Sequence, residues 1–294
     1  MELAYTLQPE PTPEERYRII DPLIAYNEAQ AGPRNSKEFA FFVRSETTEL
    51  VGGLLGSTHF NHFFVSAIFI DQEFRREGIG RELIRRAAAL ALERGCDAIY
   101  LDTFDFQAPG FYEKLGFKVF GALNDYPTGH WRLYLVKRLG AGGEAQGRTT
   151  KRNFTFQPEP TPEERKRIIA PLVAYNEAQV GPQNWREFAL FVRSEIGEPV
   201  AGLLGFKHWN HFFVAALYVE QLFRKEGIGR ELMKRAEALA LEQGCDVVYL
   251  DTFDYQAPGF YEKLGFKVFG RLEDYPPGHR RFYLVKRLRS VPNG

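Results

Sequence analysis

The sequence of 294 residues has little of three things, each of which would indicate a particular class of protein. It has only two cysteines, too few for the disulfide framework of a small secreted domain. Its 38 Lys and Arg balance 38 Asp and Glu, so no excess positive charge favours nucleic acid. No run of about 20 apolar residues could span a bilayer, and the first residues lack the order of a signal peptide. We expect no nucleic acid partner, no membrane association and a cytoplasmic location.

The few cysteines and histidines also bear on chemistry. The six histidines and two cysteines lack the spacing of metal ligands, so we expect no metal site. Cys96 and Cys245 stand in equivalent stretches, ERGCD and EQGCD, each after a glycine typical of a helix end. We expect small buried thiols rather than a disulfide or a catalytic nucleophile.

What the sequence does contain is a duplication. The stretch QPEPTPEER occurs at residues 8–16 and again at 157–165, an offset of 149 residues. Without any gap, residues 5–139 match residues 154–288 at 99 of 135 positions. This period is far longer than that of solenoid repeats, so each copy is predicted to be a complete domain. We predict domains over 1–139 and 154–294, joined by a Gly-rich polar linker over 140–153 that could hold them as an intramolecular pseudo-dimer.

Within the first copy, hydrophobic periodicity and turn residues predict a mixed α/β domain. Residues 63–70, FFVSAIFI, are apolar on nearly both faces, as expected for a strand at the centre of a sheet. The strand, helix, strand passage that begins there implies a parallel strand pair with helices on both faces of the sheet. Helices are predicted over 14–30, 80–94 and 109–115, and strands over 39–45, 50–57, 63–70, 98–104, 117–123 and 131–137.

A glycine-rich turn joins the central strand to the long helix in both copies, RREGIGR at 75–81 and RKEGIGR at 224–230. The glycines permit a close approach of the backbone, and the start of the helix offers unpaired N–H groups and a partial positive charge. These features favour binding of a pyrophosphate, although a Gly-x-Gly turn before a helix is by itself weak evidence.

A second motif, APGFYEKLGF, follows at residues 108–117 and again at 257–266. The order strand, R-x-x-G-x-G, amphipathic helix, strand and then this motif resembles the GNAT N-acetyltransferase superfamily over nearly all of each copy. The resemblance implies two tandem GNAT-like domains. Each would have a mixed, mostly antiparallel sheet with a splayed parallel central pair, and each would bind acetyl-CoA as its cofactor.

The resemblance also implies which residues bind the cofactor. The central strand would run along the pantetheine arm, and the glycine-rich turn would hold the pyrophosphate. In the first copy these residues are Ile68, Phe69, Ile70, Arg75, Arg76, Glu77, Gly78, Ile79, Gly80 and Arg81. In the second copy they are Leu217, Tyr218, Val219, Arg224, Lys225, Glu226, Gly227, Ile228, Gly229 and Arg230.

Tyr112 and Tyr261 match the tyrosine that protonates the departing CoA thiolate in the family. A phenol with a pKa of about 10 stays protonated at neutral pH and can serve as such an acid. The alternative is an aromatic residue that only packs on the core. One departure concerns Asp105 and Asp254, which stand where many members have an Asn that bonds the cofactor. An ionised Asp cannot donate that hydrogen bond.

The general base is a second departure from the family. The central-strand positions that often hold Glu or His are Phe64 and Ser66 here, and Phe213 and Ala215 in the second copy. Four kinds of group are open alternatives. They are His62 and His211 earlier on that strand, Asp102 and Asp251 as bases or amine binders, His130 and His279 in the PxGH loops, and a chain of water.

The resulting hypothesis is an acetyl-CoA-dependent N-acetyltransferase that acts on a primary amine of a small molecule by direct attack in a ternary complex. Acetylation of a protein or peptide amine, and a non-catalytic acyl-CoA sensor, are the alternatives. Among the differences between the copies, those at four equivalent positions could give the two sites different acceptor preferences. They are Ser36 against Trp185, Ser57 against Phe206, Thr58 against Lys207, and Trp131 against Arg280.

Overall fold

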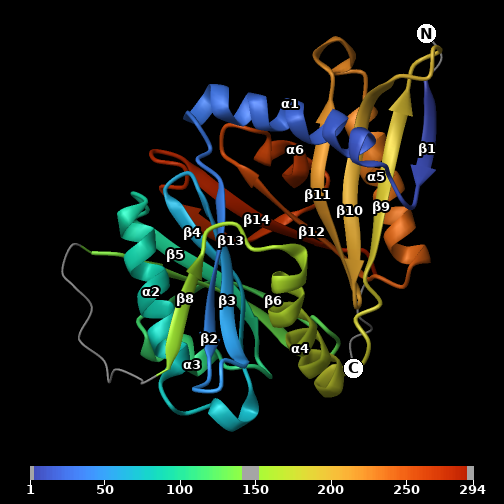
Figure 1. Cartoon of the computed structure of the whole chain (residues 1–294). Coiled ribbons are helices and arrows are strands. Elements are labelled where there is room, and N and C mark those ends of the chain that lie inside the picture. Colours follow the sequence, from blue (N-terminus) through green and yellow to red (C-terminus); the bar gives the residue numbers. More distant parts are fainter. Residues whose placement is uncertain (1–2, 141–151, 290–294) are drawn as a thin grey trace.

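The structure, a computed structural model, describes residues 3–140 and 152–289, and the two copies have the same order of elements (Figure 1). The first copy contains β1 (Ala4–Gln8), α1 (Pro13–Ala31), β2 (Lys37–Arg44), β3 (Leu50–His59), β4 (His62–Ile70), α2 (Ile79–Glu93), β5 (Ala98–Phe104), α3 (Pro109–Lys114), β6 (Lys118–Asn124) and β7 (Trp131–Arg138). The second contains β8 (Asn153–Gln157), α4 (Pro162–Val180), β9 (Arg186–Arg193), β10 (Pro199–His208), β11 (His211–Val219), α5 (Ile228–Glu242), β12 (Val247–Phe253), α6 (Pro258–Lys263), β13 (Lys267–Glu273) and β14 (Arg280–Arg287).

The fold class predicted from the sequence is confirmed. Each predicted helix and strand of the first copy is present, with ends that shift by at most a few residues. Short strands β1 and β8 were not predicted, because they carry no run of apolar residues. A 3-10 turn, Gln72–Phe74 in the first copy and Gln221–Phe223 in the second, separates the central strand from the glycine-rich turn.

All described strands form one sheet in the order β1-β9-β10-β11-β12-β14-β13-β6-β7-β5-β4-β3-β2-β8. Among these strands only the pairs β4–β5 and β11–β12 are parallel. The copies meet where β6 pairs with β13 through Gly121 and Gly270. A Cβ atom on Gly121 would lie 3.1 Å from the Cα of Gly270, so the backbones can approach this closely only because both residues are glycine.

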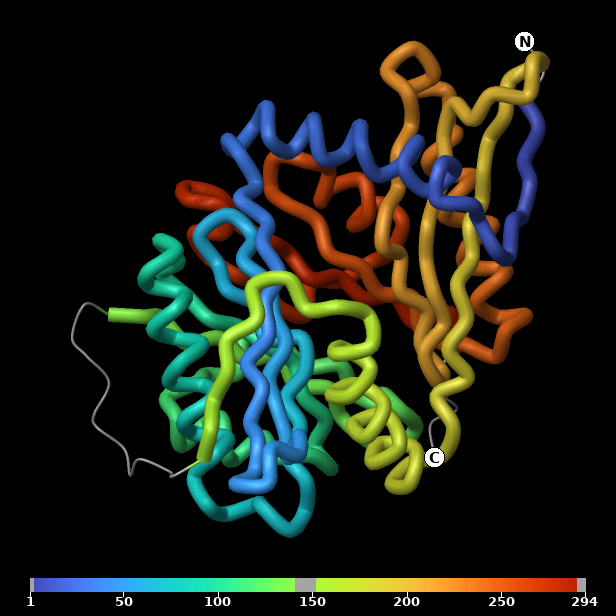
Figure 2. The backbone as a smooth tube through the Cα atoms, in the orientation of Figure 1, coloured from blue at the N-terminus to red at the C-terminus, as the bar shows by residue number. Residues whose placement is uncertain are grey.

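The copies also exchange their first strand and helix. Strand β1 pairs with β9 of the second copy, and β8 pairs with β2 of the first. Figure 1 shows α1 lying across β10 and β11, whereas α4 lies beside β3 on the other half. The tube in Figure 2 follows the chain after α1 as it crosses from one half of the molecule to the other. Each half is therefore built from both copies.

Buried side chains hold the exchanged helices in place. Both helices begin with a capping box, Thr12 with Glu15 and Thr161 with Glu164, that satisfies the first free N–H groups. Ile168 of α4 is fully buried against Ala40, Phe42, Leu55 and Ala67 of the first copy. A Cβ atom on Gly53 of β3 would lie 2.7 Å from the Cδ1 of Ile168, so the glycine makes room for the helix.

The predicted domain boundaries describe the sequence copies, 1–139 and 154–294. Because of the exchange, each half of the sheet consists of most strands of one copy together with the first strand of the opposite copy, and the first helix of the opposite copy packs on it. Most of the predicted linker, residues 141–151, lies outside the described residues. Of its last two residues, Arg152 bonds the carboxylate of Glu77 and Asn153 opens β8.

Candidate active site

A cavity opens in each half where the parallel strands separate. Strands β4 and β5 pair from His62 with Ala98 to Val65 with Leu101, and beyond that point they diverge although both continue. A β-bulge in the pairing of β3 with β4 leaves Ser66 as the extra residue at the point of divergence. The first cavity has a volume of about 670 Å³ and the second, between β11 and β12, about 680 Å³.

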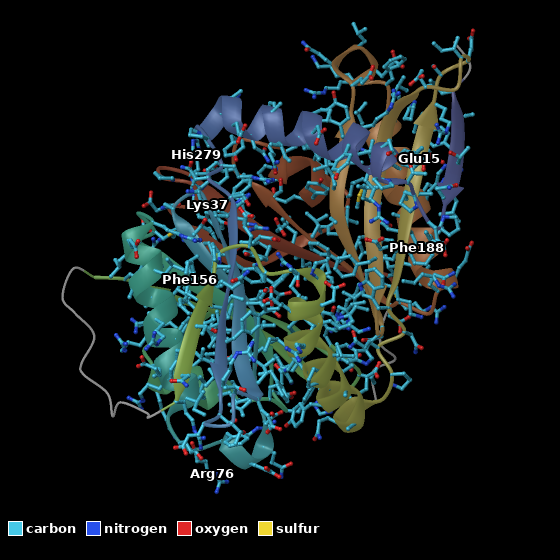
Figure 3. The ribbon with its side chains drawn as sticks, in the orientation of Figure 1. Glu15, Lys37, Arg76, Phe156, Phe188 and His279 are labelled. Atoms are coloured by element: carbon cyan, nitrogen blue, oxygen red, sulfur yellow. The ribbon has the colours of Figure 1, made fainter. Side chains whose placement is uncertain are left out.

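The glycine-rich turn forms one wall of each cavity. Gly78 has φ +84° and caps α2, and no side chain bonds the free N–H groups of the first turn. The Nε of Arg75 donates to the carbonyl oxygen of Ile70 at 2.9 Å, which ties the turn to the end of β4. Arg76, exposed on the outer edge of the molecule in Figure 3, also lines the cavity. The wall thus offers N–H groups and cations to an anion.

The predicted cofactor residues line the cavities with one exception in each copy. Ile68, Phe69 and Ile70 line the first cavity, and Leu217, Tyr218 and Val219 line the second. All turn residues do so except Glu77 and Glu226. The carboxylate of Glu77 points to Arg152, at 3.0 Å, and is not part of the cavity wall.

The shape of the site fits the cofactor that the turn implies. A Cβ atom on Gly80 would lie 3.1 Å from the Cζ of Phe111 and 3.3 Å from the Cδ1 of Ile70, so the first turn of α2 packs closely against both side chains. An open helix start beside two splayed strands suits a pyrophosphate followed by an extended, amide-containing arm. The turn would hold the phosphates, and the edge of β4 beyond Val65 would bond the arm.

Tyr112 lies on α3 and lines the first cavity, and Tyr261 on α6 lines the second. Tyr112 is 6% exposed and packs against Phe111 and Phe117. Burial, with a contribution from the Asp102 carboxylate, raises the pKa of Tyr112 above its usual value. Burial and Asp251 do the same for Tyr261. Both phenols therefore hold their proton at neutral pH, and each packs on the core and lines a cavity at once.

Asp102 lies at the end of β5 and lines the first cavity. Arg132 donates to the Oδ2 of Asp102 through Nε at 2.8 Å, and its Nη2 lies 2.7 Å from the same oxygen. Among the described residues no group donates to Oδ1, which leaves this oxygen free to accept a hydrogen bond. Asp251 and Arg281 repeat the arrangement in the second copy.

The predicted histidines of the central strand lie elsewhere. His62 is fully buried, and its ring stacks on Tyr275 of the other copy with centroids 4.1 Å apart. Burial, with nearby Arg138 and Arg281, lowers the pKa of His62 to about 3. His211 stacks on Tyr126 in the same way, and burial lowers its pKa. Neither residue lines a cavity, which argues against a role as base.

The remaining sequence candidates are also outside the cavity walls. His130 bonds Asp105 through Nδ1 at 3.0 Å, and His279 bonds Asp254 at the same distance. The two aspartates that replace the family's Asn thus bond a histidine. Burial raises the pKa of Cys96 and Cys245 to about 11, and both thiols are buried in the cores. The residues at the four predicted points of difference between the copies, such as Trp185 and Trp131, line neither cavity.

Residues of the exchanged helices complete the walls, and this was not predicted from the sequence. Leu172, Tyr175 and Asn176 of α4 line the first cavity, and Leu23 and Tyr26 of α1 line the second. Gln107 also lines the first cavity and donates to the Oδ1 of Asn176 at 2.8 Å. No local pattern could reveal this contribution, because both copies carry the same helix and its partner is chosen by tertiary packing.

Comparison with known proteins identifies the class to which this fold and site belong. The model of the acetyltransferase (GNAT) family matches residues 2–117 and again 155–266. The chain belongs to the acetyltransferase (GNAT) family, it is an acyltransferase that carries two copies of the family domain, and its cofactor is acetyl-CoA.

Individual relatives match a single copy. A blasticidin-S acetyltransferase of Streptomyces morookaense is 40% identical over 102 residues, which are 34% of this chain and 75% of that protein. An acetyltransferase of Agrobacterium fabrum is 32% identical over 126 residues, 43% of this chain and 92% of that protein. A crystal structure of an acetyltransferase from Bacillus cereus is 33% identical and covers 44% of this chain and 95% of that chain, with a TM-score of 0.42. Within the described ranges, no helix is long and apolar enough to cross a membrane.

Proposed function

We propose that each cavity transfers an acetyl group to a primary amine of a small molecule by direct attack in a ternary complex. The observation that carries this proposal is the meeting of three groups at one cavity, the open start of α2, the protonated phenol of Tyr112 and the free Oδ1 of Asp102. The name of the Streptomyces relative, an acetyltransferase of an antibiotic, supports a small acceptor. A cytoplasmic location stays a prediction.

Each group has one task in this mechanism. When bound, acetyl-CoA supplies the acetyl thioester and its thiolate leaving group. The Oδ1 of Asp102 accepts a hydrogen bond from the acceptor amine and orients its lone pair. The salt bridge from Arg132 to Oδ2 holds the Asp102 carboxylate in position. Main-chain N–H groups of β4 beyond Val65 polarise the carbonyl, and the phenol of Tyr112 gives its proton to the leaving sulfur.

Asp102 suits the acceptor amine better than the histidines do. A carboxylate attracts a cationic amine and accepts its proton or hydrogen bond, whereas the buried rings of His62 and His211 face the other copy. Loss of the second amine proton after attack requires only a route to solvent. The same roles fall to Asp251 and Tyr261 in the second cavity.

The test measures the release of free CoA thiol from acetyl-CoA by the full chain with a panel of small amines, amino acids and peptides. We expect turnover with at least one small amine, and retained CoA binding but little turnover when Tyr112→Phe and Tyr261→Phe are combined. Tight CoA binding with no thiol release on any amine would instead indicate an acyl-CoA sensor. Preference for peptides would place the acceptor among protein amines.

A further inference from the structure

The exchanged helices give each cavity a wall that its own copy does not encode. In the first cavity this wall comes from α4 of the second copy, through Leu172, Tyr175 and Asn176. Two contacts fix its place, because Tyr175 donates its hydroxyl to the carbonyl oxygen of Phe106 at 3.2 Å and the guanidinium of Arg75 lies 5.5 Å from the centre of its ring. No residue of α1, the equivalent helix of the first copy, lines the first cavity.

The orientation of the Asn176 amide follows from its hydrogen bonds. The Oε1 of Gln107 accepts from the main-chain N–H of Phe104 at 3.0 Å and from the Thr103 hydroxyl at 2.8 Å. Because the N–H of Phe104 can only donate, Oε1 must face it, and the Nε2 of Gln107 therefore faces Asn176. Asn176 must in turn present its Oδ1, at 2.8 Å.

In this chain of bonds the Nδ2 donors of Asn176 have no partner. Asn176 is 8% exposed and lines the cavity, and among the described residues no group accepts from its Nδ2. A donor held in a nearly buried amide favours a ligand that brings an acceptor to it. The cavity also contains the free Oδ1 of Asp102 and the ring of Tyr175.

We infer that Asn176 is a specificity-determining residue of the first site although it belongs to the second copy. It would donate to a carbonyl or hydroxyl oxygen of the acceptor, while Asp102 meets the amine and Tyr175 covers the apolar or planar part. The acceptor class is thus a small amine with a neighbouring oxygen acceptor. The equivalent Asn27 does not itself line the second cavity, but it accepts at 2.8 Å from Gln256, which does, so we expect a weaker effect of the same kind there. The inference rests on the proposed function.

The experiment separates the two sites within the full chain. Tyr261→Phe leaves the first site as the main source of turnover, and Tyr112→Phe leaves the second. Asn176→Leu and Asn27→Leu are placed in each background, and KM for the acceptor, KM for acetyl-CoA and kcat are measured. Asn176→Asp is a second variant that keeps an oxygen for the bond from Gln107 and replaces the Nδ2 donors by a negatively charged acceptor oxygen. Gln179→Ala, an exposed change one turn further along α4, is the matched control.

The expected pattern is crossed. Asn176→Leu raises the acceptor KM roughly tenfold in the Tyr261→Phe background, as expected for loss of one hydrogen bond. Asn27→Leu raises the acceptor KM less, and only in the Tyr112→Phe background, because Asn27 contacts the second cavity through Gln256. KM for acetyl-CoA moves little in both backgrounds. The inference is overturned if each Asn variant raises the acceptor KM of the site that belongs to its own copy. It is also overturned if the acceptor KM changes in neither background. If the wild-type chain releases no thiol with any amine of the panel, the proposed function is overturned, and the inference with it.

Discussion

The first and second cavities share the groups that do chemistry and differ mainly along the central strand. Both have a glycine-capped helix, a buried tyrosine, an Asp–Arg pair and an exchanged helix with Leu and Tyr at the same positions. They differ in the strand beside the cofactor, where Ser66 and Phe69 of the first copy correspond to Ala215 and Tyr218 of the second. Divergence has therefore spared the chemistry, and we expect the two sites to catalyse the same reaction at similar rates.

The largest effect is expected from the tyrosines. Tyr112→Phe and Tyr261→Phe each remove the proton donor of one site, so turnover at that site falls by about 10²–10⁴-fold. The whole chain keeps roughly half its thiol release in either single variant if the sites are equivalent. Loss of all activity in one single variant, with the fold intact, would contradict equal and separate sites.

The Asp–Arg pairs are expected to matter next. Arg132→Met leaves the largely buried Asp102 carboxylate without its partner, and Arg132 also donates to Tyr126 and to Tyr249 of the other copy. Loss of a partner in such a pair costs about 3 kcal/mol of unfolding free energy. Urea unfolding should show a similar loss for Arg281→Met, and Asp102→Asn should recover part of the loss in Arg132→Met. Clearly unequal losses would show that the two halves are not equally coupled.

The interface histidines predict a dependence of stability on pH. The folded-state pKa of His62 is lowered to about 3, against about 6.5 for a free side chain, so the unfolded state binds more protons between these values. The unfolding free energy should therefore be highest above pH 6.5 and fall as pH drops below it, by about 1.4 kcal/mol per pH unit for each such histidine.

His62→Gln and His211→Gln test this dependence. Each variant should reduce the slope of the unfolding free energy against pH, between pH 7.5 and pH 5, by the equivalent of about one bound proton. The two reductions should be equal if the halves match. His59 and His208 also have pKa values lowered to about 3, and they account for a slope that remains in the double variant. A wild-type stability that does not change over this range would contradict neutral burial of these rings.

The smallest effect is expected at the second glycine of the turn, and here the halves should differ. A Cβ atom on Gly80 would lie 3.1 Å from Phe111, whereas one on Gly229 would lie 3.5 Å from Phe260, an ordinary contact. Gly80→Ala should lower the unfolding free energy by about 1 kcal/mol more than Gly229→Ala does. Thermal unfolding of the two variants checks this, and equal shifts would show that Phe111 moves aside freely.

Much of the fold and site could be predicted from the sequence, because local patterns carry it. The apolar strand 63–70, the glycines at 78 and 80 and the tyrosine at 112 act over short spacings. Their places follow from strand order alone, and the structure brings them to one cavity. Arg132, thirty residues away on β7, binds Oδ2 of Asp102 and leaves Oδ1 free. No sequence spacing indicates that contact.

The histidines show a different limit. Alternation along β4 correctly puts His62 and Phe64 on one face, since the strand begins at His62. The sequence of one copy cannot show that this face is covered by Tyr275 of the other, which turns an apparent base into an interface residue. The exchange of α1 and α4 escapes prediction for the same reason, because the two helices have nearly the same sequence and their partner is set by tertiary packing, which the sequence of one copy does not show.

The exchange also constrains how the two copies can change over time. A substitution in the helix of one copy is inherited with that copy but alters the cavity of the other. A new acceptor preference in one cavity therefore needs matching changes on both sides of the internal repeat. This linkage would oppose the usual fate of a duplicated domain, in which one half drifts while the other keeps the ancestral task, and it is consistent with two halves that still match at 99 of 135 positions.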